Sequence, residues 1–147
     1  MNKTDRQRIS ELLNKYKPNK QEIRELKGLV EFLEDQKDTG FIKSVLPELD
    51  KVTSSKNLDG QENQIISNLS KIEFIKHKIE TLEKENRFIE FLMSNLEDET
   101  KAIFEDRFVN GDKIVAISMN HCISESTVYK MIREGYKSIA SMLNKIA

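Results

Sequence analysis

The sequence of 147 residues has no tryptophan, two prolines and five glycines. So few turn-forming residues exclude a many-stranded β fold, and Glu, Lys, Leu and Ile recur instead at helical spacing. Because only 37% of the residues are hydrophobic and 33% are charged, any core must be built from narrow apolar stripes on amphipathic helices. We therefore predict an all-α fold.

The sequence has a single cysteine, Cys122, which excludes an internal disulfide and suits a reducing cytoplasm. Long hydrophobic runs are also missing. The opening MNKTDRQRISELL has no stretch suited to a signal peptide, and no segment has the length that spans a bilayer. The sequence predicts a cytoplasmic protein with no membrane partner.

An excess of charge of one sign is missing as well, because 24 basic residues face 25 acidic ones and the formal net charge is -1. The whole chain therefore offers no polycationic surface, and any binding to nucleic acid must be local. The C-terminal segment 124–147 has such a local bias. Its charged residues are the basic Lys130, Arg133, Lys137 and Lys145 and the acidic Glu125 and Glu134.

Apolar spacing predicts two helices in residues 1–38. The first is capped by Thr4 and ends at Pro18, and the second covers about 19–38; together they form an N-terminal helical hairpin. The segment 39–60 contains glycine, proline and a Thr-Ser-Ser run, so it is expected to be a linker. The apolar positions of the hairpin are Ile9, Leu12, Leu13 and Tyr16, then Ile23, Leu26, Val30 and Leu33.

Residues 61–94 are expected to form one long helix with a coiled-coil-like heptad pattern. One use of this seam is a homodimer, in which the polar Asn86 would fix the register of the two strands. The other use is packing inside the monomer against the first two helices, because additional apolar residues widen the stripe beyond a two-stranded seam. The candidate dimerisation residues are Ile72, Ile75, Ile79, Leu82, Asn86 and Ile89.

Residues 95–147 contain three further helical segments, at about 97–109, 113–121 and 124–144. The last two satisfy the spacing of a helix-turn-helix: a small Ser118 where the helices cross, an apolar Ile123 in the turn, and an apolar stripe on the second helix. Ser124 is a suitable N-cap residue for that second helix. In a duplex complex this helix would read the major groove, with basic, hydroxyl and aromatic side chains on phosphates and base edges. The candidate DNA-binding residues are Ser124, Glu125, Ser126, Thr127, Tyr129, Lys130, Arg133 and Lys137.

The segments LEDETKAIFEDRFVNG and DKIVAISMNHCISESTVYKMIREGYKSIASML resemble the fourth conserved region of bacterial sigma factors. They are still more similar to phage late-gene transcription regulators of the ArpU and RinA type. The resemblance rests on the Arg107-Phe108 pair, the Ile117-Ser118 step and the run from Ile123 to Tyr129. It implies a sequence-specific DNA-binding transcription regulator that activates promoters in a phage or mobile element. The implied partners are double-stranded DNA and, through the N-terminal helices, RNA polymerase or another regulatory protein.

Three residues depart from the family pattern. His121 stands where an apolar residue is usual, and Cys122 stands where Asn, Asp or Gly is common. Gly135 replaces the usual Ala, which should cost ~1 kcal/mol of helix stability.

Two other classes of function fit the same features. One is a module that binds a partner protein and not DNA, and the other is a small DNA-packaging (terminase) subunit. Nothing in the sequence indicates an enzyme, a cofactor or a metal site, because the neighbouring His121 and Cys122 have no second cysteine or carboxylate cluster to complete a site.

Overall fold

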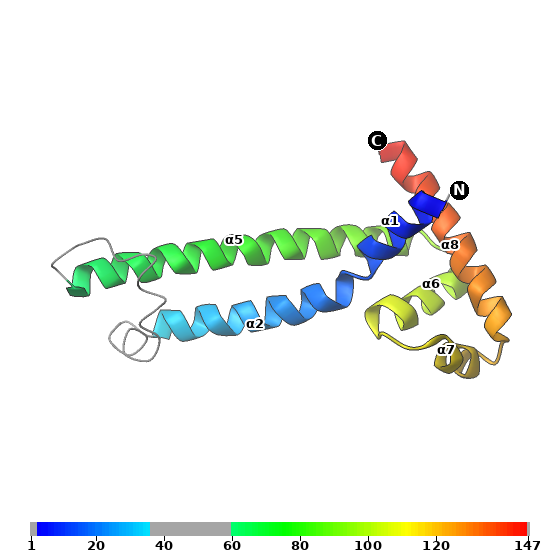
Figure 1. The fold of residues 1–147 in the computed structure, drawn as a ribbon, viewed down its shortest axis with the longest axis horizontal. Coiled ribbons are helices and arrows are strands. Elements are labelled where there is room, and N and C mark those ends of the chain that lie inside the picture. Colours follow the sequence, from blue (N-terminus) through cyan, green and yellow to red (C-terminus); the bar gives the residue numbers. More distant parts are fainter. Residues whose placement is uncertain (1–2, 36–59, 147) are drawn as a thin grey trace. The chain divides into compact units, whose positions relative to one another are not determined.

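The computed structural model describes residues 3–35 and 60–146, and every element in them is a helix (Figure 1). The all-α prediction is confirmed for this part of the chain. None of its helices is both long enough and apolar enough to cross a membrane. The elements are α1 (Lys3–Leu13), α2 (Tyr16–Asp35), α5 (Gly60–Ser94), α6 (Asp98–Phe104), the π-helical turn η1 (Glu105–Val109), α7 (Ile114–His121) and α8 (Glu125–Ile146).

The chain divides into two compact units, and both α2 and α5 contribute to each of them. Unit 1 combines residues 1–21 with 82–147, and unit 2 comprises residues 22–81. The division of the chain at 38, 60 and 94 stays a prediction. The predicted linker lies outside the described residues, except that Gly60 is the first residue of α5.

Unit 2 is built on the side-by-side, antiparallel course of α2 and α5 (Figure 1). Two ion pairs flank the apolar contact, Lys76 Nζ to Glu34 Oε1 and Lys78 Nζ to Glu22 Oε1, each 3.0 Å long. The candidate dimerisation residues of this part of α5 therefore have packing partners within the chain. The cluster consists of buried Val30, Leu33, Ile72 and Ile79, with Ile23, Leu26 and Ile75 packed against it.

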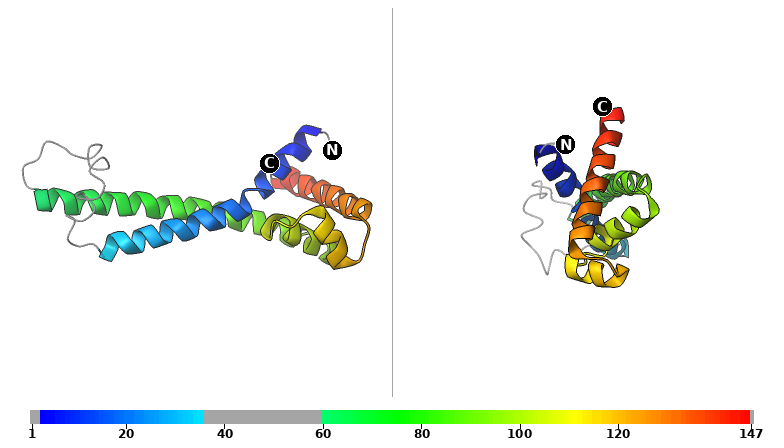
Figure 2. Two further views of the ribbon diagram at one scale, coloured as in Figure 1. Left: turned by 60° about the horizontal axis from the view of Figure 1, so that its bottom comes forward. Right: turned by 90° about the vertical axis from the view of Figure 1, so that its right-hand side faces the viewer.

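Unit 1 has a core to which both ends of the described chain contribute. Ile9 and Leu13 of α1 are buried in the same cluster as Ile132 and Ile139 of α8, and α1 lies beside α8 (Figures 1 and 2). The predicted hairpin residues thus fall into two separate clusters, because Val30 and Leu33 belong to unit 2. The first cluster also joins Tyr16 of α2 to Ile9 and Leu13 of α1.

Pro18 does not end the first helix, contrary to the prediction. Helix α1 ends at Leu13, and α2 begins at Tyr16, ahead of the proline. Pro18 is therefore in the first turn of α2, where a backbone N–H has no helical partner and its absence costs nothing. The break between α1 and α2 falls at 14–15.

Asn86 is 5% exposed, and its hydrogen bonds are satisfied inside unit 1. Its side-chain oxygen accepts from Asn19 Nδ2 at 2.9 Å, and its Nδ2 donates to the Tyr16 carbonyl at 3.2 Å. The second residue of this pair, Asn19, also donates to Glu85 Oε1 at 2.8 Å. Asn86 and Ile89 of the candidate dimerisation set are buried within the chain, and Leu82 is half-buried.

The Tyr16 hydroxyl donates a 2.5 Å hydrogen bond to Glu90 Oε1. Burial, with this bond to a carboxylate as the next cause, raises the pKa of Tyr16 to about 12. Tyr16 is therefore neutral at physiological pH and joins the start of α2 to α5.

Candidate nucleic-acid interface

The turn between α7 and α8 depends on Cys122. Its backbone angles, φ 56° and ψ 41°, lie in the left-handed region. Residues other than Gly, Asn and Asp rarely adopt this conformation. The Ile123 N–H then donates to the Ser118 carbonyl at 3.0 Å and closes the end of α7. This geometry explains why Asn, Asp and Gly are the residues that the resemblance leads one to expect at position 122.

Ser124 caps α8, as the sequence predicts, because its Oγ accepts from the Thr127 N–H at 3.1 Å. The same Oγ lies 3.0 Å from Ser126 Oγ and 2.8 Å from Thr127 Oγ1. Three neighbouring hydroxyl groups thus form one hydrogen-bonded group at the start of the helix. The N–H of Thr127 is occupied by this cap and does not point free toward a ligand.

Helix α8 has two distinct faces. Val128, Ile132, Gly135, Tyr136 and Ile139 are buried. On the outward side, five of the candidate DNA-binding residues follow the spacing i, i+3, i+4, i+7 and i+11, and so form one stripe along the helix. All five are exposed: Ser126, Tyr129, Lys130, Arg133 and Lys137.

The remaining candidates lie off this outward stripe. Glu125 is exposed in the first turn of α8, one helical turn before Tyr129. Thr127 is half-buried and belongs to the hydroxyl group around Ser124. The structure therefore brings five of the eight predicted residues together on the stripe and places the other three at the helix start.

Gly135 permits a close approach of α8 to α6. A Cβ atom at this position would lie 2.3 Å from Phe104 Cε1 and 3.1 Å from Thr100 Cγ2. The Phe104 ring is fully buried and packs edge-on against Tyr136, with 5.7 Å between the ring centroids. The close packing of Phe104 against α8 therefore explains why a glycine stands at position 135, despite its low helix propensity.

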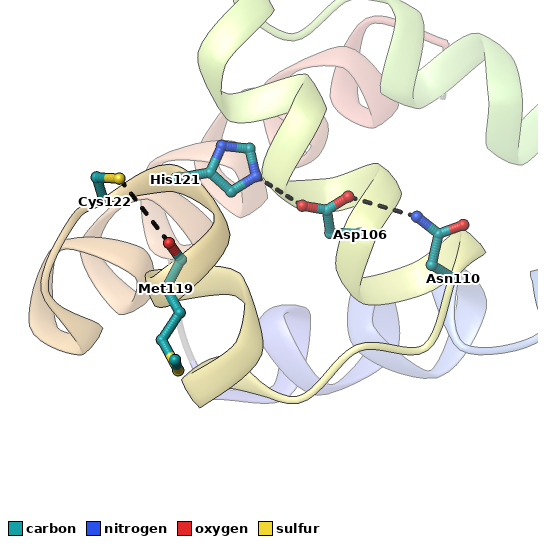
Figure 3. Close-up of polar contacts among 5 residues, drawn as sticks. All are labelled: Asp106, Asn110, Met119, His121 and Cys122. Carbon is teal, nitrogen blue, oxygen red and sulfur yellow. Dashed lines mark hydrogen bonds and ion pairs between the residues drawn. The ribbon is translucent and has the colours of Figure 1, made fainter.

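His121 joins the end of α7 to η1 (Figure 3). Its Nε2 lies 2.6 Å from Asp106 Oδ2, and Asn110 Nδ2 donates to the other oxygen, Oδ1, at 3.4 Å. A polar contact to Asp106 thus takes the place of the apolar packing expected at position 121. In the described parts of the chain, no group of three or more His, Cys, Asp or Glu side chains is arranged to hold a metal ion.

A hollow of about 480 Å³ opens beside the outward stripe. Arg6 of α1 reaches it, although sequence reasoning did not select this residue, because no local pattern marks it as a neighbour of α8. Arg107, noted for the family resemblance alone, lines it too. Its other lining residues are Ile114, Ser126, Tyr129, Ile132, Arg133 and Tyr136.

The fold and this surface define an all-α protein in which a helix, a tight turn and a longer helix present a polar, partly basic stripe. The chain belongs to the family described as "Protein of unknown function (DUF722)", whose model matches residues 29–141. No curated protein and no solved structure matches the chain. Its function must therefore be argued from its own residues.

Proposed function

We propose that this protein is a sequence-specific DNA-binding transcription regulator that docks the N-terminal half of α8 in the major groove. The observation that carries the proposal is the exposed stripe of Ser126, Tyr129, Lys130, Arg133 and Lys137. A helix with its side chains is about 10–12 Å across, and the major groove is about 12 Å wide. The buried face of α8 holds it on α6 and α7 while the stripe remains accessible.

The stripe offers the chemistry that base edges and phosphates require. Arg133 and Lys130 can donate to guanine O6 and N7 or to a phosphate, and Lys137 to a phosphate further along the duplex. Tyr129, 55% exposed, can contact a phosphate or a thymine methyl group. Glu125 can accept from cytosine N4 and would oppose a phosphate at that position.

The resemblance to ArpU- and RinA-type regulators supports promoters of a phage or mobile element as the targets. The near-zero net charge of the chain gives little non-specific attraction to DNA. We infer that a second copy of the chain, or RNA polymerase, completes the affinity at a promoter. Either partner would add contacts to the DNA beyond those of one stripe of five side chains.

The first test is selection of bound duplexes from a random pool at physiological salt, followed by footprinting on the selected site. We expect Arg133→Ala to weaken binding to that site by roughly 5- to 150-fold, since a good base contact is worth about 1–3 kcal/mol. Arg87→Ala is the matched control, because Arg87 is an exposed arginine on α5 and is not one of the five stripe residues. Circular dichroism should show both variants folded.

One result would count against the proposed function and another against the role of Arg133. If the wild-type chain enriches no sequence over the random pool, the regulator function fails. An unchanged footprint for Arg133→Ala would instead remove Arg133 from base recognition, and Lys130 and Thr127 would become the residues to substitute.

A further inference from the structure

The hollow beside α8 is lined by three arginines that lie far apart in the sequence. Arg6 comes from α1, Arg107 from η1 and Arg133 from α8. All three belong to unit 1, so the packing of α1 on α8 brings Arg6 to the other two. Ile114, Ile132 and Tyr136 also line the hollow.

Among the residues that the structure describes, no acidic side chain lines this hollow. The three guanidinium groups belong to exposed residues, and within the described residues none of them forms an ion pair. Arg107 Nη1 donates to the Asp112 carbonyl at 3.1 Å, which orients that side chain and leaves its other donors available. Ser126 and Tyr129 add two hydroxyl groups. The site is therefore rich in donors and positive charge and has no carboxylate of its own.

Three neighbouring positive charges repel one another, and the attraction of each of them to an anion placed between them offsets this repulsion. The planar guanidinium fork matches the oxygens of a phosphate group, which accept two parallel hydrogen bonds. We propose that the hollow formed by Arg6, Arg107 and Arg133 binds a phosphate group. On the function proposed above, that group is a backbone phosphate of the duplex that α8 reads, because Ser126, Tyr129 and Arg133 belong to both the hollow and the stripe.

The test compares Arg6→Gln with Arg8→Gln. Both arginines are exposed on α1, but Arg8 does not line the hollow, so the two variants lose the same charge from the same helix. Duplex affinity is measured by fluorescence anisotropy as a function of salt. Loss of one phosphate contact should make the negative slope of log K against log salt shallower by about 0.9 and lower the affinity by roughly three- to tenfold. Arg8→Gln should match the wild type in both quantities.

A second arm uses inorganic pyrophosphate without DNA, with chloride at equal ionic strength as the reference. Pyrophosphate should raise the thermal midpoint of the wild type and of Arg8→Gln, and raise that of Arg6→Gln clearly less. If the wild type fails to bind DNA but shows this pattern, the regulator function is lost and the hollow stands as the site of a smaller phosphate-bearing ligand.

The proposal is overturned if Arg6→Gln and Arg8→Gln behave alike in both arms. Equal losses in both variants would mean that α1 contributes only diffuse charge, and no loss in either would mean that the hollow binds no phosphate. Normal helix content and an unchanged thermal midpoint in chloride establish that each variant is folded.

Discussion

Replacing Gly135 by Ala tests the close approach of α6 and α8. In an open helix this change stabilises by ~1 kcal/mol, but here the new Cβ would lie 2.3 and 2.4 Å from two atoms of the Phe104 ring. The ring cannot move away freely, because it is fully buried and packs against Phe108 at 5.4 Å and Tyr136 at 5.7 Å. Overpacking of this kind costs about 1–3 kcal/mol. After subtraction of the gain in helix propensity, we expect a net loss of up to about 2 kcal/mol and a fall in Tm of up to about 8 °C.

The control is Gly28→Ala, at a second helical glycine. A Cβ there meets no atom within 4 Å, so urea denaturation followed by circular dichroism should show a gain of about 0.5–1 kcal/mol. The double variant Phe104→Leu with Gly135→Ala should recover part of the loss, because the smaller side chain makes room for the methyl group. If Gly135→Ala stabilises the chain as much as Gly28→Ala does, the close contact between Phe104 and Gly135 is refuted.

The remaining predictions test one backbone conformation and two polar contacts. Cys122→Gly should raise the free energy of unfolding by about 0.5–1 kcal/mol in urea denaturation, since glycine adopts the left-handed angles at little cost. A lower free energy of unfolding would mean that the cysteine side chain stabilises the fold by more than its left-handed backbone angles cost. Asp106→Ala should lower the Tm by an amount equivalent to about 1 kcal/mol, and adding His121→Ala should change it little further if the two act as one contact. Tyr16→Phe should remove a step near pH 12 from the tyrosinate absorbance of the folded protein. Because folding raises the pKa of Tyr16 from 10.0 to about 12, its contribution to stability is present below pH 10.0 and is lost as pH rises through about 12. If the step that Tyr16→Phe removes lies near pH 10.0, this prediction is contradicted.

Local signals in the sequence predicted the turn before α8 well. Serine is a preferred N-cap residue, and Ser124 is the N-cap of α8 in the structure. A proline, in contrast, is compatible with both the end of one helix and the first turn of the next, so Pro18 alone could not place the break between α1 and α2. Helix boundaries were predictable where one residue type has one structural use.

Packing partners could not be read from periodicity. A heptad stripe buries the same residues whether its partner is a second copy or another helix of the same chain, so the sequence left the use of Asn86 open. The structure supplies its partners, Asn19 and the Tyr16 carbonyl. Arg6 and Gly135 depend on contacts between segments distant in the sequence, and neither has a local signal that would reveal those contacts.

The shared core of α1 and α8 has a consequence for how the chain is made. A ribosome synthesises α1 before α8, but Ile9 and Leu13 pack in one cluster with Ile132 and Ile139, which are synthesised only after α5, α6 and α7. An N-terminal domain usually folds while the rest of the chain is being translated. Unit 1 cannot do so, because its core is incomplete until α8 has been synthesised. A chain interrupted before α8 would expose the apolar face of α1, so cellular quality control would meet incomplete chains with that face uncovered.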